Sequence, residues 1–221
     1  MYQTDFSCEE FAARRKRVLE AIGNEGVALI QGGPKEQASD LFRQTNDFYY
    51  LCGVEVPHAY LLIDGRADAS YLFLPHQSQE RREKEGEALS PQNADQVCRL
   101  TGMDEVHGIE DLGRFLERST VIFTPMREAE GTRMSWDGLQ RTHQEAVADP
   151  WDGQQGRMRA FIALLGDRVP AADIRDLAPV LDELRLVKSE AETELLRKAG
   201  ELTAIAVVEA MRSTQPGVME Y

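Results

Sequence analysis

Charged side chains gather beside one aromatic run of the sequence. Asp40 and Arg43 flank Phe42, and Asp47 immediately precedes Phe48-Tyr49-Tyr50. Carboxylate and guanidinium groups in such a loop can contact a ligand, but an Arg and an Asp near the entrance of a strand also often pair to fix a loop. The structural role is the simpler explanation, and both roles stay open for Asp40, Arg43 and Asp47.

The histidines lack the spacing of a hydrolytic metal site. No two of them have HxxxH spacing, and none is combined with a glutamate as in HExxH. Asp64 and Asp68 bracket a predicted hairpin and could share a cation, but turn formation explains both residues. Neither a phosphate-binding loop nor a GxSxG nucleophile pattern is present. The sequence therefore predicts no catalytic residue and no metal ligand in this chain.

Two Trp-Asp-Gly triplets begin at Trp136 and Trp151, within a stretch, 127–156, that interrupts the alternation of helix and strand. We interpret this stretch as an excursion from the core. Asp and Gly favour turns, so each triplet is expected to be a turn whose Trp covers local apolar surface. The alternative is that Trp136 and Trp151 contact a partner subunit or a peptide, because aromatic residues are favoured interface anchors.

The composition excludes several classes of partner. Asp and Glu total 38 against 25 Lys and Arg, and the net charge of −13 repels nucleic acid and anionic lipid. No apolar run is long enough to span a bilayer and the first residues do not read as a secretory signal, so we expect a cytoplasmic protein. The basic run Arg14-Arg15-Lys16-Arg17 is interpreted as a solvated helix face. The three cysteines are expected to be reduced thiols, with Cys52 and Cys98 in the core.

The periodicity predicts an α/β fold with a mixed, mostly parallel sheet flanked by helices. Ser7 and Glu10 form a capping box that starts the first helix. Further helices are expected at 93–100, 109–117, 157–165 and 180–187. The predicted strands are Val27–Gln31, Phe48–Leu51, Tyr60–Asp64, Ser70–Leu74, Glu105–His107, Val121–Thr124 and Ile174–Asp176.

A long helix is predicted at the end of the chain. A second capping box, Ser189 to Glu192, starts it, and the helical pattern persists to about Thr214. Its apolar stripe, from Leu195 to Ala210, suits packing against a further domain. We therefore predict two parts: an α/β domain at 1–177, and linker helices with the start of a second domain at 178–221.

One segment resembles a known family. Phe42-Arg43-Gln44, followed by Asp47-Phe48-Tyr49-Tyr50-Leu51 and Gly53, is similar to the FRQ-x-x-DFYYL-x-G segment of the amino-terminal domain of the Xaa-Pro aminopeptidase (aminopeptidase P) family. The linker Arg185–Ala199 also falls in the family's order. This resemblance implies a creatinase-like amino-terminal α/β domain joined in cis to a pita-bread metallopeptidase domain.

The same resemblance implies where the chemistry lies. In that family, two Mn(II) ions held by two Asp, one His and two Glu activate the water that attacks the bond before a penultimate proline. All five ligands belong to the catalytic half, so no cofactor is expected in this chain. The amino-terminal domain is implied to assemble a homo-oligomer, a dimer or a tetramer, and to limit access of peptide substrates. Residues 81–89 lack the tryptophan that some relatives place there, which leaves the substrate preference open.

The sequence thus suggests the non-catalytic amino-terminal domain of a metal-dependent Xaa-Pro aminopeptidase, inactive alone, with assembly and substrate-gating roles. The gating or interface candidates are Asp40, Arg43, Asp47, Trp136 and Trp151. Two alternatives stay open. One is a stand-alone peptide- or protein-binding module with this fold, and the other is a related prolidase or creatinase.

Overall fold

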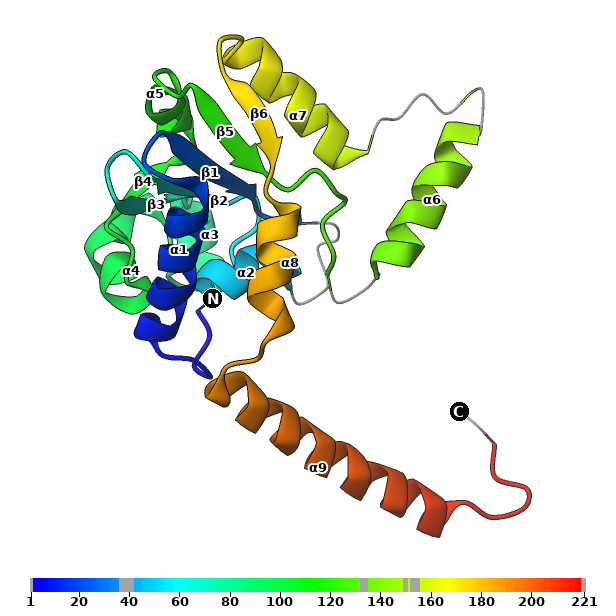
Figure 1. The fold of residues 1–221 in the computed structure, drawn as a ribbon. Helices are drawn as coiled ribbons and strands as arrows, with labels where there is room; N and C mark the ends of the chain where they lie inside the picture. The colour runs from blue at the N-terminus through cyan, green and yellow to red at the C-terminus, as the bar shows by residue number, and fades with distance from the viewer. Residues whose placement is uncertain (1, 36–41, 132–134, 149–150, 152–155, 220–221) are drawn as a thin grey trace. The chain divides into compact units, whose positions relative to one another are not determined.

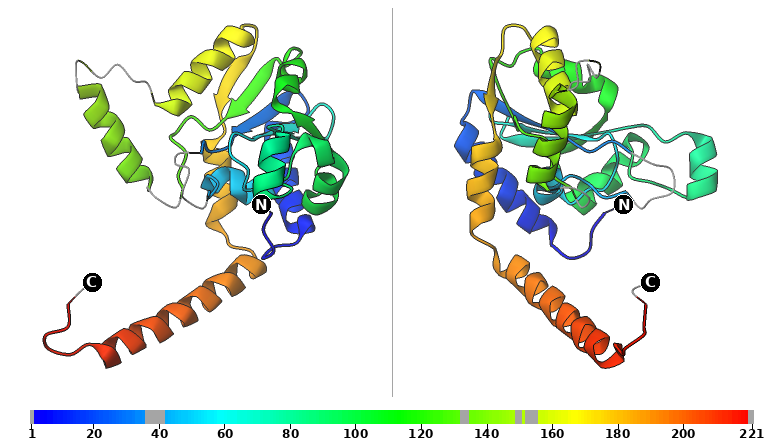
Figure 2. Two further views of the ribbon diagram at one scale, coloured as in Figure 1. Left: turned by 180° about the vertical axis from the view of Figure 1, so that it is seen from behind. Right: turned by 90° about the vertical axis from the view of Figure 1, so that its right-hand side faces the viewer.

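The computed structural model describes residues 2–35, 42–131, 135–148, 151 and 156–219. The chain divides into two compact units, Met1–Leu184 and Arg185–Tyr221. The first unit contains a sheet with helices on both faces (Figures 1 and 2). The predicted division at 177/178 concerns functional domains and stays a prediction.

Six strands form the sheet in the order β4-β3-β2-β1-β5-β6. β2 pairs antiparallel with both β1 and β3, whereas the pairs β1–β5, β5–β6 and β3–β4 are parallel. The predicted mixed, mostly parallel sheet is therefore confirmed. The strands are β1 Gly26–Gln31, β2 Tyr60–Asp64, β3 Ala69–Leu74, β4 Glu105–Gly108, β5 Val121–Thr124 and β6 Asp173–Asp176.

Side chains alternate along β1 between two apolar clusters. Ala28 and Ile30 pack with α1, α2, α4 and α8, while Val27 and Leu29 pack on the other face with α5 and α7. The helices are α1 Cys8–Ile22, α2 Asn46–Cys52, α3 Gln79–Glu85, α4 Ala94–Thr101, α5 Leu112–Leu116, α6 Trp136–Ala148, α7 Arg157–Arg168, α8 Ala178–Leu186 and α9 Glu190–Ser213. Two short 3-10 turns are η1 Pro91–Asn93 and η2 Ile109–Asp111.

The prediction of a strand at Phe48–Leu51 is wrong, because these residues lie in α2. Asp47 occupies the first turn, where a carboxylate is favourable. Gly53 ends the helix with a left-handed φ of 65°, and its N–H bonds the carbonyl of Tyr49. The other predicted strands are present, each within a residue or two of its expected limits.

The interpretation of the first Trp-Asp-Gly triplet as a turn is also wrong. Trp136 begins α6, and the N–H of Gly138 donates to Ser135 Oγ at 3.4 Å. Ser135 thus acts as an N-terminal cap, so the triplet forms the first helical turn. Trp151 does lie in a turn, while the rest of the second triplet is outside the described residues.

Two residues of the basic run are not solvated. Arg14 and Arg15 are buried in α1, and only Lys16 and Arg17 are exposed. Arg15 donates to the carbonyls of Leu51 and Gly102 at 3.1 and 2.7 Å, so it joins α1 to the ends of α2 and α4. The solvated-face interpretation is wrong for Arg14 and Arg15, because both guanidinium groups are buried and donate to carbonyls of distant segments.

The cysteine predictions are half right. Cys52 is fully buried in the core, as expected, but Cys98 is only partly buried on α4. The predicted core position of Cys98 is therefore wrong.

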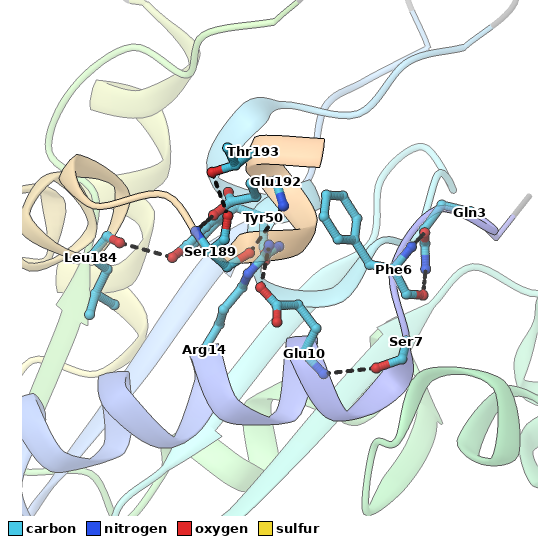
Figure 3. Close-up of polar contacts among 10 residues, drawn as sticks. All are labelled: Gln3, Phe6, Ser7, Glu10, Arg14, Tyr50, Leu184, Ser189, Glu192 and Thr193. Carbon is cyan, nitrogen blue, oxygen red and sulfur yellow. Dashed lines mark hydrogen bonds and ion pairs between the residues drawn. The ribbon is translucent and has the colours of Figure 1, made fainter. Parts of the chain in front are cut away.

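The second unit consists mainly of α9, and its predicted capping box is present. Ser189 Oγ accepts from the N–H of Glu192 at 3.2 Å, and the Glu192 carboxylate accepts from the N–H of Ser189 at 2.8 Å (Figure 3). Every described residue from Leu196 onward is exposed. No described helix is long and apolar enough to cross a membrane.

Candidate functional site

The segment 42–56 forms the best candidate site, because its polar groups contact four other parts of the first unit. Gln44 is buried where the loop after β1 meets the loop before β2. Its Oε1 accepts from the N–H groups of Gly33 and Thr45 at 2.5 and 2.9 Å, and its Nε2 donates to the carbonyl of Val56 at 3.0 Å. Gln44 therefore has a structural role that the sequence did not suggest.

Arg43 lies at the surface of this segment. Its Nη1 lies 2.7 Å from Oε2 of Glu55, and the Arg43 side chain is 48% exposed while that of Glu55 is 8% exposed. An ion pair with one buried partner orients the guanidinium at the edge of the loop. A ligand-contacting role for Arg43 stays a prediction.

Asp47 is buried in the first turn of α2, next to Arg127. Arg127 Nη2 lies 3.2 Å from Asp47 Oδ2, and Arg127 Nη1 donates to both carboxylate oxygens of Asp182 at 2.6 and 2.8 Å. Burial alone would lower the pKa of Arg127, but the two carboxylates outweigh it and raise that pKa above its ordinary value. Arg127 therefore stays charged and connects α2 to α8.

Sequence reasoning missed Arg127 and Asp182. They lie 80 and 135 residues from Asp47, and no local pattern marks them. Only the pairing of β5 beside β1 brings the loop that carries Arg127 near α2.

Tyr50 makes a further polar contact of α2. Its hydroxyl donates to the carbonyl of Leu184 at 3.1 Å (Figure 3). Arg14 Nη1 donates to the Tyr50 carbonyl at 3.0 Å, and the Arg14 guanidinium lies 4.3 Å from the centre of the Tyr50 ring. Glu10 also bonds Arg14, at 3.0 Å. The orientation of Tyr50 is thus fixed by a buried arginine on α1.

The remaining predicted residues are placed as follows. Asp40 lies outside the described residues, as does the side chain of Trp136, whose backbone begins α6. Trp151 is described, and its side chain is 93% exposed. The structure therefore associates Asp47 with Arg127 and Arg43 with Glu55, and it leaves the roles of Asp40, Trp136 and Trp151 as predictions.

The described part of the chain offers no cluster of three His, Cys, Asp or Glu side chains that could hold a metal ion. Asp64 is instead held by its own turn, where Oδ1 accepts from the N–H and the Nε of Arg66, both at 2.9 Å. Burial would raise the pKa of Asp64, but the hydrogen bonds and charge of Arg66 lower it below its ordinary value.

A known family matches this chain. Its description is "Aminopeptidase P, N-terminal domain", and the match covers residues 11–123, just over half of the chain.

Curated relatives align over nearly the whole chain. The Xaa-Pro aminopeptidase of Haemophilus influenzae is 26% identical, with 100% of this chain and 46% of that protein covered. The Xaa-Pro aminopeptidase of Escherichia coli is 28% identical, with 99% and 47% covered. Human Xaa-Pro aminopeptidase 3 is 26% identical, with 96% and 41% covered. The chain spans about half the length of the curated relatives it matches.

Solved structures give the same result. Aminopeptidase P from E. coli with the inhibitor Pro-Leu superposes with a TM-score of 0.71 at 25% identity, covering 99% of this chain and 47% of that one. Proline aminopeptidase P II from Yersinia pestis gives a TM-score of 0.70 at 25% identity, covering 98% and 48%.

Proposed function

Because the chain belongs to the aminopeptidase P family, as its amino-terminal domain, we propose that it serves a metal-dependent Xaa-Pro aminopeptidase as a non-catalytic part. The observation that carries this proposal is the alignment over the whole chain to about half of each relative. The other half would hold the reactive site, with two Mn(II) or other divalent ions. No residue of this chain is assigned as a ligand to them.

The surface of α9 supports a further domain in cis. The sequence predicted one apolar stripe, but apolar side chains are exposed around the helix, for example Ile205 at 66% and Met211 at 74%. Large apolar side chains gathered on a helix are normally covered by another element. The occupant that we propose is the catalytic part of the same polypeptide, because the relatives are about twice as long as this chain. The other exposed apolar residues of α9 are Leu196, Leu202, Val207 and Val208.

Assembly and substrate-gating roles are proposed for the surface of this domain. Of the residues predicted for these roles, Asp40, Arg43, Trp136 and Trp151 remain those proposed to face a partner copy or a peptide substrate. Asp47 is buried against Arg127, so its proposed role is to support this surface from within. An exposed tryptophan such as Trp151 suits an interface anchor. We further propose a homo-oligomeric, cytoplasmic protein that acts on peptides, and the charge of −13 disfavours nucleic acid as a partner.

The test compares the product of the full gene with the 221-residue chain. Both are assayed with Mn(II) for release of the first residue from Xaa-Pro peptides, and a peptide without proline is the control. We expect activity from the full product alone. A full product of about 24.8 kDa that binds peptides without cleaving them would contradict the proposal.

A second test addresses α9. Val208→Asp should destabilise the full-length protein and leave the unfolding of the isolated chain unchanged, because Val208 is exposed in the chain. Glu201→Gln, at another exposed position of α9, is the control. Equal stability of the Val208→Asp and wild-type full-length proteins would exclude a domain packed on this face.

A further inference from the structure

We propose that Asp47 and Tyr50 are positioning residues: together they clamp the end of α8 and thereby hold the catalytic part of the protein in its working position. This inference rests on the proposed function for its catalytic consequence, but the clamp itself can be tested in the isolated chain.

The spacing of Asp47 and Tyr50 along α2 places both side chains where they can hold α8. Positions three apart on a helix share a face, so Asp47 and Tyr50 lie on the same side of α2. Asp47 contacts Arg127, and Tyr50 contacts Leu184. Both are buried, and α2 packs in the core through Phe48 and Leu51. The clamp is therefore built on a rigid helix.

Tyr50 binds a group that α8 cannot satisfy by itself. The last four carbonyls of a helix lack intrahelical partners, and Leu184 is two residues before the end of α8. The Tyr50 hydroxyl donates to this carbonyl at 3.1 Å. The hydrogen bond thus fixes the last turn of α8.

Arg14 prepares Tyr50 for this contact. It donates to the Tyr50 backbone at 3.0 Å, and its guanidinium lies against the Tyr50 ring (Figure 3). Because the ring is already held, little side-chain freedom remains to be lost when the hydroxyl binds Leu184.

Asp47 reaches the same helix through Arg127. One guanidinium nitrogen lies 3.2 Å from Asp47, and the other lies 2.6 Å from Asp182. Asp182 precedes Leu184 by two residues. α8 is therefore held at two nearby points, by a hydrogen bond and by an ion-paired arginine.

The position of these contacts gives the clamp its function. The first unit ends at Leu184, so the clamped residues are the last ones before the polypeptide leaves it. Loosening them would leave the core intact but would make the path of the following chain less defined. A small misplacement of reacting groups costs rate more than it costs substrate affinity.

The first experiment measures hydrogen exchange in the 221-residue chain. Tyr50→Phe removes the hydroxyl and keeps the ring, so amides of residues 183–188 should exchange roughly 2- to 12-fold faster, as for the loss of one hydrogen bond. Tyr49→Phe is the matched control, since no hydrogen bond of the Tyr49 hydroxyl is present among the described residues. Unchanged exchange in Tyr50→Phe, or equal acceleration in Tyr49→Phe, would overturn the clamp.

The second experiment uses the full-length protein and separates kcat from KM. Tyr50→Phe and Asp182→Asn should each lower kcat for an Xaa-Pro peptide roughly 2- to 10-fold with little change in KM. Tyr49→Phe and Glu183→Gln, which alter the neighbouring residues, should leave both constants unchanged. Equal kcat in all four variants would overturn the positioning role. If the wild-type protein cleaves no such peptide, the proposed function fails, while the exchange result still decides the clamp.

Discussion

Gly53 lies directly against the ring of Phe11. A Cβ placed on Gly53 would be 2.7 Å from Phe11 Cζ, and Gly53 has a φ of +65°. Both the left-handed backbone and the close packing therefore require glycine at this position of the motif.

Gly53→Ala should lower the free energy of unfolding by about 2–4 kcal/mol, through left-handed strain of about 1 kcal/mol plus overpacking. Gly86→Ala is the matched control, because Gly86 ends α3 with a φ of +81° but has no atom within 4 Å of the added Cβ. Its cost should stay near 1 kcal/mol or below. Urea denaturation of both variants gives the comparison, and equal losses would show that Phe11 can move aside.

Arg15→Met should destabilise the chain by about 2–4 kcal/mol, because it leaves buried carbonyls without a donor. Those carbonyls belong to Leu51, Thr101 and Gly102. Burial also lowers the pKa of Arg15, so this cation is costly unless its bonds are made. The exposed Arg17→Met should change stability by less than about 0.5 kcal/mol. Similar urea midpoints for the two variants would argue against a buried Arg15.

Cys52 should be unreactive in the folded protein. Burial raises the pKa of its thiol to about 12, so almost no thiolate exists near neutral pH. A variant that keeps only Cys52 should react with a disulfide reagent at pH 8 at least roughly 100-fold more slowly than one that keeps only Cys98. Both should react alike in denaturant, and fast labelling of native Cys52 would contradict its burial.

Asp64→Asn should change the pH dependence of stability on the acid side. The pKa of Asp64 is lowered on folding, so its ionised form stabilises the protein above its ordinary pKa of about 3.9 and this contribution is lost as pH falls through the folded value. The variant should have a lower free energy of unfolding than the wild type at pH 6, and this difference should become smaller below about pH 4. Urea titrations at both pH values measure it. Asp68→Asn is the control, because it removes another negative charge from the same turn. If the difference in free energy of unfolding between Asp64→Asn and the wild type did not change with pH, the pairing with Arg66 would be refuted.

Strands β1, β2, β3 and β5 were predictable because each contains a short apolar run next to turn residues. The two edge strands, β4 and β6, each have only one large apolar residue, and they were predicted from the alternation of helix and strand. α2 was not predictable, because seven residues rich in aromatics satisfy a strand pattern as well as a helical one. What decides it is Gly53 at its end and the contacts of Arg14 and Arg15, which come from another helix. The candidate site shows the same limit. Asp47 could be singled out because it stands in a recognisable motif, whereas Arg127 and Asp182 become its neighbours only after the chain has folded.

The connection between β5 and β6 contains one helix that packs in the core and one that does not. It runs from Thr124 to Asp173 and contains α7, which supplies Phe161 and Leu165 to a core cluster. Among its described residues, α6 supplies none to either cluster. Lengthening such a connection costs only about 0.6 kcal/mol for each doubling of its length. The segment of α6, Trp136–Ala148, is thus where this fold can gain or lose sequence in evolution most cheaply, whereas Arg127 must stay for the α2–α8 contacts to be kept.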